Sequence, residues 1–259
     1  MTLDGRVALI TGGTRGIGRG IAEALVAVGA RVVISGRSAE KGERAVVEMN
    51  AGERLRFIAC DVRDRSQVDR LVDETVEHFG GLHILINNAG GSDGFALIHD
   101  MSDEAWDNAL ALNLNSTFWA TRRALPHMLK GRWGRVIAIS SVEGKQATKA
   151  MVSHYITNKH AINGFAKAIA FEYGEQGITS NAICPGAVET DTMRTAGLAA
   201  AQAAGLTYGQ FLQAYADETM IKRLIRVEEV AALAELLCSD AGGGITGALL
   251  NVDGGSSSW

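Results

Sequence analysis

The sequence predicts an α/β fold with a parallel sheet, and three observations lead to it. Short runs of β-branched residues alternate with longer segments of helical periodicity, which is the pattern of stacked βαβ units. Several of the short runs lack polar alternation, as expected of strands covered by helices on both faces. The chain has 31 glycines and only 2 prolines, without a linker or a repeat. Together these observations predict one domain over residues 1–259.

Strands and helices are expected in alternation over most of the chain. Strands are expected in the short apolar runs at residues 6–11, 31–35, 54–60, 83–86, 134–140, 179–184 and 248–252. Helices are expected over the longer segments at residues 17–28, 39–49, 66–79, 103–129, 152–174, 208–218 and 227–238. Ser102 or Asp103 is a suitable N-cap for the fourth helix. The glycine-rich stretches at 90–94 and 242–247 are expected to be loops.

Composition and charge exclude several classes of protein. Lys and Arg number 25 and Asp and Glu 29, so the net charge of −4 argues against broad nucleic-acid binding. The 3 cysteines lie far apart in apolar surroundings, as expected of reduced core residues. The first residues do not show the basic and apolar regions of a secretory leader, so none is expected. No apolar run has membrane-spanning length, and the 6 histidines have no metal-ligand spacing. We therefore expect a cytoplasmic protein with no membrane, nucleic acid or metal as a partner.

A glycine-rich turn follows the first expected strand. The run Gly12, Gly13, Thr14, Arg15, Gly16, Ile17 and Gly18 leads directly into an amphipathic helix. Glycines in this place let the backbone approach a pyrophosphate, whose charge is stabilised at the positive N-terminus of the helix. A glycine cluster alone is weak evidence, and an ordinary strand-to-helix turn is the alternative. Its position between the first strand and a helix favours a dinucleotide-binding loop.

The end of the second expected strand bears on which dinucleotide is bound. An NAD-binding protein carries an acidic residue about 20 residues past the glycine loop, where it bonds the adenine ribose. This chain has Gly36 and Arg37 there, and Arg15 lies in the loop itself. Two guanidinium groups without a carboxylate suit a 2′-phosphate, so NADP(H) is favoured over NAD(H). The alternative is that both arginines are only solvated surface residues.

A tyrosine and a lysine are expected on one face of the helix at 152–174. Tyr155 and Lys159 are four residues apart, which places them about one helical turn from each other. Ser140 and Ser141 end the fifth expected strand, at the edge where open α/β sheets bind ligands. These groups converge with the dinucleotide loop on one edge of the sheet.

On these motifs the chain resembles the short-chain dehydrogenase/reductase family over essentially its whole length. The matching pieces are residues 11–18, Asp61-Val62, Asn87-Asn88-Ala89-Gly90, Asn113, Ser141, Tyr155 with Lys159, Asn181, Pro185-Gly186 through Thr190, and residues 251–255. The resemblance implies a single Rossmann-type domain, whose doubly wound sheet has seven parallel strands with helices on both faces. It also implies a catalytic set of Asn113, Ser141, Tyr155 and Lys159, and a homotetramer.

The resemblance further implies a role for each site residue. Tyr155 would protonate the carbonyl oxygen, Ser141 would orient it, and Asn113 would hold a water that relays protons to Lys159. Lys159 would hold the nicotinamide ribose and, with the cationic nicotinamide, lower the pKa of Tyr155. Asp61 and Val62 are expected at the adenine and Thr190 at the carboxamide. The expected cofactor-binding set is Gly12, Thr14, Arg15, Gly16, Ile17, Gly18, Arg37, Asp61, Val62, Asn88, Ala89, Gly90, Tyr155, Lys159, Pro185, Gly186, Val188 and Thr190.

The spacing between the serine and the tyrosine departs from the family pattern. Ser141 and Tyr155 are 14 positions apart, one more than is usual in the family. Either the loop at 142–154 has one extra residue, which we favour, or the serine is misplaced by one and Ser140 takes its role. A third interpretation is that Ser141 is a strand-end hydroxyl that only satisfies the backbone.

A long segment after Pro185, at about residues 186–220, is expected to form a lid over the substrate. Its larger side chains are Met193, Leu198, Leu206, Tyr208, Phe211, Leu212, Tyr215 and Met220, and its one basic residue is Arg194. This composition favours an apolar or neutral carbonyl substrate over a small polyanion. The alternative is that these side chains pack only against their own domain.

The loops near the expected site indicate a substrate class within the family. Residues 144–146 and 181–186 look like those of aromatic-polyketide ketoreductases and 3-oxoacyl reductases. The acidic helix end at 172–176 does not suit an acidic carrier protein, so a free or CoA-linked substrate is at least as well supported. We expect an NADP(H)-dependent ketone reductase acting on a small molecule. The alternatives are an NAD-dependent secondary-alcohol dehydrogenase and a non-catalytic dinucleotide-sensing protein.

Overall fold

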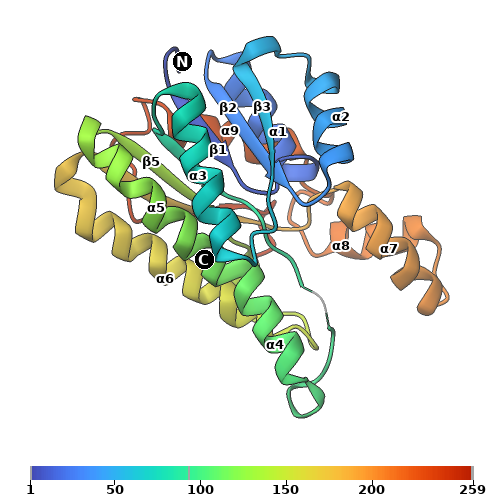
Figure 1. The fold of residues 1–259 in the computed structure, drawn as a ribbon. Coiled ribbons are helices and arrows are strands. Elements are labelled where there is room, and N and C mark those ends of the chain that lie inside the picture. The colour runs from blue at the N-terminus through green and yellow to red at the C-terminus, as the bar shows by residue number, and fades with distance from the viewer. Residues whose placement is uncertain (1, 93, 258–259) are drawn as a thin grey trace.

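The computed structural model describes residues 2–92 and 94–257, and it contains a sheet of seven parallel strands (Figure 1). The strands are β1 (Val7–Ile10), β2 (Arg31–Gly36), β3 (Leu55–Ala59), β4 (Ile84–Asn87), β5 (Gly134–Ile139), β6 (Ile178–Pro185) and β7 (Leu249–Val252). Their order across the sheet is β3-β2-β1-β4-β5-β6-β7. The first three strands therefore run in chain order from the middle of the sheet to one edge, and the last four run from the middle to the other edge. The doubly wound Rossmann-type fold is confirmed, and each strand lies within one residue of its expected bounds.

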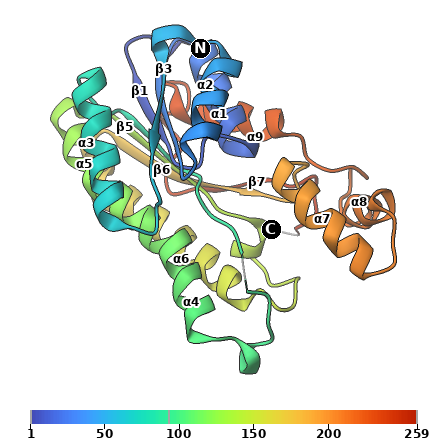
Figure 2. The same cartoon turned by 45° about the vertical axis from the view of Figure 1, so that its right-hand side comes forward.

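Helices cover both faces of the sheet (Figure 2). One face is covered by α1 (Gly16–Ala27), α2 (Ala39–Met49) and α9 (Val227–Cys238), and the other by α3 (Arg65–Phe79), α5 (Ser116–Gly131) and α6 (Ser153–Tyr173). Helix α4 (Asp103–Leu110) precedes α5. Helices α7 (Asp191–Ala203) and α8 (Tyr208–Asp217) stand apart from the sheet at one side of the molecule.

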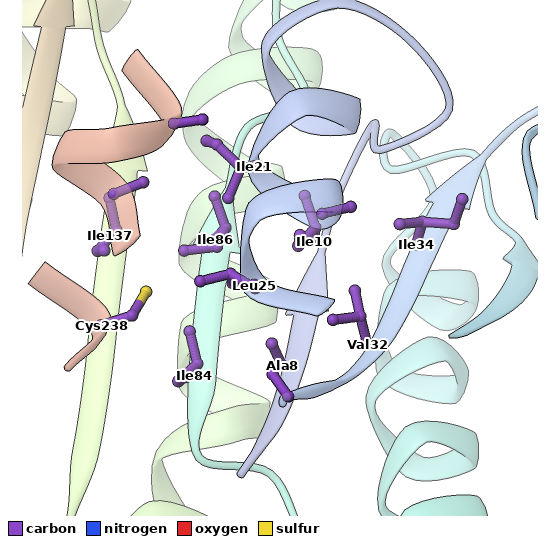
Figure 3. Close-up of a cluster of buried hydrophobic side chains, with 14 of the residues drawn as sticks. Ala8, Ile10, Ile21, Leu25, Val32, Ile34, Ile84, Ile86, Ile137 and Cys238 are labelled. Atoms are coloured by element: carbon purple, nitrogen blue, oxygen red, sulfur yellow. The ribbon is translucent and has the colours of Figure 1, made fainter. Parts of the chain in front are cut away.

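Apolar side chains on both faces of each central strand explain the missing polar alternation. Successive residues of a strand point to opposite faces, so Ala8 and Ile10 of β1 pack with Ile21 and Leu25 of α1 (Figure 3). Their neighbours Val7 and Leu9 pack on the opposite face. Full burial of an aliphatic side chain contributes about 1.5–3 kcal/mol, so the two cores hold β1 from both sides.

Two helical segments differ from the sequence-based expectation. The helix expected at 103–129 is interrupted by a π-helical turn at Ala111–Asn115, between α4 and α5. Helix α7 lies in the segment expected to form a lid, for which no helix was predicted before residue 208. Short 3₁₀ helices add turns at Gly52–Arg54, Ile98–Asp100, Val142–Gly144 and Gly174–Gln176.

The segment that is expected to form a lid is closed at its base by a parallel bridge between Val188 and Ile225. The Glu189 N–H donates to the Ile225 carbonyl oxygen at 3.2 Å, and the Ile225 N–H donates to that of Ala187 at 2.9 Å. The chain between Val188 and Ile225, residues 189–224, is therefore an excursion closed at its base, and it contains most of the segment at 186–220 that is expected to form a lid.

Two further features concern the environment of the chain. Among the described residues, none of the helices combines the length and the apolarity that a membrane span requires. The thiols of Cys60, Cys184 and Cys238 are free and buried.

Candidate active site

The glycine loop between β1 and α1 is fixed by Asn88, which follows β4. The Asn88 amide nitrogen donates to the carbonyl oxygens of Thr11 at 2.9 Å and Gly12 at 3.0 Å. Gly12 and Gly16 have φ values of +67° and +55°, which side chains rarely allow. A Cβ at Gly18 would lie 2.6 Å from the Gly12 carbonyl oxygen and would also collide with the Asn88 amide. The loop is therefore held in one shape that only glycine fits.

The N-terminus of α1 opens directly from this loop. Its N-cap residue Arg15 makes no side-chain capping bond, and its first turn contains no acidic residue. The first N–H groups of the helix can therefore serve an anion such as a pyrophosphate. Thr190 lies beside this point, since its Cγ2 is 3.4 Å from where a Cβ of Gly16 would be. Two parts of the expected cofactor set, far apart in sequence, thus meet at one edge of the sheet.

The end of β2 carries exposed guanidinium groups. Arg15 and Arg37 are exposed, and the ion pairs found among residues 2–92 and 94–257 include neither of them. Asp61, after β3, is instead paired with Arg63, with 2.6 Å between Nη2 and Oδ2. Hydrogen bonds from Arg63, with a smaller contribution from the charge of Arg37, lower the pKa of Asp61. The negative charge of Asp61 is therefore already balanced by the guanidinium of Arg63.

Ser141 and Tyr155 meet at the carboxyl edge of the sheet. Ser141 follows β5, Tyr155 lies in the first turns of α6, and their side chains are hydrogen-bonded to each other. The Ser141 hydroxyl oxygen also accepts from the Glu143 N–H at 3.1 Å. Ser140 points elsewhere, and its hydroxyl donates to the Lys159 carbonyl oxygen at 3.3 Å. The geometry favours Ser141 over Ser140 and places the extra residue in the loop at 142–154.

Lys159 is buried close to Tyr155, with 4% of its surface exposed. Its Nζ donates to the Ile139 carbonyl oxygen at 2.7 Å and lies 5.4 Å from the centre of the Tyr155 ring. Burial lowers the pKa of Lys159 to about 8 and raises the pKa of Tyr155. The direction for Tyr155 is opposite to the expected one, because burial raises its pKa by more than the hydrogen bond with Ser141 lowers it. The expectation also required the positive charge of a nicotinamide.

Asn113 is fully buried in the π-helical turn. Its amide nitrogen donates to the carbonyl oxygens of Gly91 and Ala109, each at 2.9 Å, and its Oδ1 accepts from the Gly91 N–H at 3.1 Å. A Cβ at Gly90 would lie 2.8 Å from Asn113 Oδ1 and 3.3 Å from Lys159 Nζ. The structure therefore brings the asparagine and the lysine close to the same glycine.

The remaining expected cofactor residues lie along the same edge. Thr14 lies against Gly36, and the partly buried Ile17 packs against the core beneath α1. The Ala89 N–H donates to Thr11 Oγ1 at 3.0 Å, and Gly186 packs against Asp253. Val62 is buried, Pro185 ends β6, and Val188 forms the bridge at the base of the lid.

The lid helices pack on each other, and they contact the loop after Ser141. A Cβ at Gly197 in α7 would lie 2.7 Å from Phe211 and 3.0 Å from Tyr208. These two rings of α8 therefore pack against α7. Lys149 of the loop donates to Glu218 at 2.8 and 3.1 Å and lies 4.5 Å from the centre of the Tyr215 ring. Leu198, Leu206 and Met220 remain exposed.

Sequence reasoning missed the residues that shape the loop between Ser141 and Tyr155. Glu143 is buried, and its carboxylate accepts hydrogen bonds from the N–H and the hydroxyl of Thr148. Lys145 donates to Asn251 Oδ1 of β7 at 2.9 Å. The only signal for these roles was the closeness of charged residues to Ser141 in the sequence.

Comparison with known proteins decides the family. The family model described as short chain dehydrogenase matches residues 6–200. The chain belongs to the short-chain dehydrogenase family. It is an oxidoreductase acting on hydroxyl or keto groups of small molecules, and this family uses a nicotinamide dinucleotide.

Relatives and solved structures cover nearly the whole chain. A D-beta-hydroxybutyrate dehydrogenase of Cupriavidus necator is 38% identical over 98% of this chain and 98% of its own. A 3-oxoacyl-(acyl-carrier-protein) reductase of Aquifex aeolicus is 34% identical over the same shares. The crystal structure of an actinorhodin polyketide ketoreductase variant with NADPH matches with a TM-score of 0.92 and 33% identity, over 98% of both chains. The expected likeness to 3-oxoacyl and polyketide reductases is confirmed.

Proposed function

We propose that this short-chain dehydrogenase is an NADP(H)-dependent reductase of neutral or apolar ketones, including 3-oxoacyl compounds, that are free or CoA-linked. The observation that carries this proposal is the hydrogen-bonded pair of Ser141 and Tyr155 beside the buried Lys159, at the edge where the glycine loop ends. The composition of the lid and the reductases among the relatives support the direction and the substrate class.

Tyr155 acts as the general acid in this proposal. The bound cofactor supplies the hydride, and negative charge develops on the carbonyl oxygen, which the Tyr155 hydroxyl protonates. The raised pKa of Tyr155 keeps the phenol protonated at neutral pH, as an acid for reduction must be. Ser141 donates a hydrogen bond that orients the carbonyl. Lys159 holds the nicotinamide ribose, and Asn113 positions a water that returns a proton to Lys159.

The preference for NADP(H) is proposed from the rim at β2. The exposed guanidinium groups of Arg15 and Arg37 suit a 2′-phosphate, and the Asp61 carboxylate is paired with Arg63 rather than turned to a ribose. A solved neighbour that contains NADPH supports the same choice. The competing assignment is an NAD-dependent secondary-alcohol dehydrogenase.

Steady-state kinetics with a ketone panel tests the proposal. We expect kcat/KM with NADPH to exceed kcat/KM with NADH. Tyr155→Phe removes the proton donor and is expected to lower kcat by about 10²–10⁴-fold while cofactor affinity changes little. Turnover that survives this change would mean that Tyr155 is not the acid, and a strong NADH preference would overturn the cofactor assignment. A chain that binds NADPH and reduces no ketone would be the dinucleotide sensor instead.

We also propose a homotetramer in the cytoplasm. The outer faces of α5 and α6 expose large apolar side chains, including Phe118 and Phe171, the latter 93% exposed. Burial of such side chains between copies of the chain would remove them from water. Native mass spectrometry tests the assembly, and a monomer at micromolar concentration would contradict it.

A further inference from the structure

Glu143 places a buried negative charge next to the catalytic serine. It lies two residues after Ser141 and has 6% of its surface exposed. Both of its acceptor bonds go to Thr148, one from the backbone N–H at 3.0 Å and one from the hydroxyl. The ion pairs that the structure shows for residues 2–92 and 94–257 do not include Glu143. A glutamine could make both bonds to Thr148, so the loop geometry does not require the charge.

The cations near this loop have other partners. Lys145 donates to Asn251 of β7, and Lys149 is paired with Glu218 beyond the lid helix α8. Lys159 donates to the Ile139 carbonyl oxygen, and burial lowers its pKa to about 8. A carboxylate on a substrate would therefore approach a site in which the positive charges are engaged or weakened.

The charge of Glu143 is felt at the reacting hydroxyl. Burial is the main cause of the raised pKa of Tyr155, and the negative charge of Glu143 raises it further. A negative group that acts on the Tyr155 oxygen also acts on an anionic group of a substrate bound there, since the carbonyl oxygen must contact the same hydroxyl.

We propose that Glu143 is a specificity-determining residue that excludes substrates with a carboxylate one methylene away from the reacting carbonyl, as in 3-oxo acids. This inference rests on the proposed function and deepens it, because it restricts the substrate class to neutral ketones such as esters, thioesters and amides of 3-oxo acids. A relative whose name specifies D-beta-hydroxybutyrate, a carboxylate, is 38% identical. The proposal places the substrates of this chain in a different charge class despite that similarity.

A matched pair of substrates tests the exclusion. Ethyl 3-oxobutanoate and 3-oxobutanoate share the reacting carbonyl, and they differ in one charge and one ethyl group, the second of which is the same for every protein variant compared. We expect the wild-type protein to prefer the ester by about 100-fold in kcat/KM, and Glu143→Gln to reduce this preference by at least about tenfold. The change should come from a lower KM for the acid, because glutamine keeps the bonds to Thr148 and removes only the charge.

Thr148→Ala is the control for loop geometry. It removes one bond to Glu143 and keeps the carboxylate, so the ester preference should stay at the wild-type value. Equal efficiency of the wild-type protein with acid and ester would overturn the proposal while the reductase function stands. An unchanged preference in Glu143→Gln would also overturn it, as would an equal change in Thr148→Ala.

A second measurement needs no substrate. Absorbance titration of tyrosinate, with Tyr155→Phe subtracted, gives the pKa of Tyr155 in each variant. We expect Glu143→Gln to lower this pKa and Thr148→Ala to leave it unchanged. Cys184 and Lys159, the other groups close to Tyr155, are the same in both variants. An unchanged pKa in Glu143→Gln would overturn the proposal even if neither ketone were reduced. Failure to reduce either ketone would count separately, against the proposed function.

Discussion

The cofactor side and the substrate side of the proposed active site are held by different kinds of contact. On the cofactor side, the Asn88 amide bonds the backbone of the glycine loop between two central strands. On the substrate side, α7 and α8 pack on each other and reach the neighbouring loop through the exposed Lys149–Glu218 pair. An exposed ion pair contributes about 0–1 kcal/mol, whereas leaving a buried polar group unbonded costs about 1–3 kcal/mol. The fold therefore fixes the cofactor geometry, while access for the substrate depends on weaker contacts.

The largest expected effect is on the cofactor side. Gly18→Ala forces a methyl group against the Asn88 amide and the Gly12 carbonyl oxygen, so the bonds that fix the loop must break. We expect NADPH affinity to fall by about 100-fold or more and stability to fall by about 1–3 kcal/mol. Gly164→Ala in α6 is the matched control, since its Cβ would meet nothing within 4 Å. Titration calorimetry measures the NADPH affinity of both variants. Near-normal affinity in Gly18→Ala would show that the cofactor side does not depend on a rigid glycine loop.

A pH-dependent effect follows from the buried ammonium. The pKa of Lys159 is lowered from 10.5 to about 8, so the folded chain binds fewer protons than the unfolded chain between these values. The free energy of unfolding therefore rises with pH through that window. Below about pH 8, the cost of burying the charged ammonium lowers the free energy of unfolding by its full amount. Between about pH 7.5 and 9.5 the wild type should gain about 2 kcal/mol relative to Lys159→Met.

Denaturant unfolding at both pH values measures this difference. The buried thiols of Cys60, Cys184 and Cys238 have raised pKa values and act in the opposite direction. Cys60 and Cys238 do not interact with Lys159, so their contribution cancels in the comparison. The charge of Lys159 lowers the pKa of Cys184, which makes Lys159→Met with Cys184→Ala in both proteins the cleaner pair. Parallel pH curves for the two proteins would show that the ammonium is not buried as described.

A smaller effect is expected at the rim of the cofactor side. Arg37→Ala removes one charge-assisted bond to the proposed 2′-phosphate, and NADPH affinity should fall by about tenfold while NADH affinity stays the same. Arg65→Ala, which changes an exposed arginine of α3, is the control. Equal losses for NADPH and NADH would show that Arg37 does not bind the phosphate.

The smallest effect is expected on the substrate side. Lys149→Met removes the ion pair with Glu218 and the contact with the Tyr215 ring. Together these exposed contacts contribute about 1 kcal/mol, so opening of residues 189–224 should become about fivefold more frequent. Hydrogen exchange of the lid amides measures the opening, with Arg65→Ala again as the control. Exchange in the lid that is unaffected would show that other contacts hold it.

The sequence allowed the sheet and the cofactor side to be predicted because their signals are local. Each strand is a run of apolar residues, and the glycine loop directly joins β1 to α1. The π-helical turn could not be predicted, since it accompanies bonds from Asn113 to Gly91, far away in sequence. The packing of α7 on α8 and the burial of Glu143 likewise depend on tertiary contacts. The roles of the predicted site residues stay predictions until the variants are measured.

The bridge between Val188 and Ile225 has a consequence for engineering. It brings the two ends of a long segment to one point, and neither end lies within a strand of the sheet. A segment closed at its base in this way can be exchanged for one of another length without altering the register of β6 or β7. Grafting residues 191–224 from another member of the family, with Thr190 kept in place, is therefore a direct route to chimeric enzymes with new substrate ranges and unchanged coenzyme chemistry.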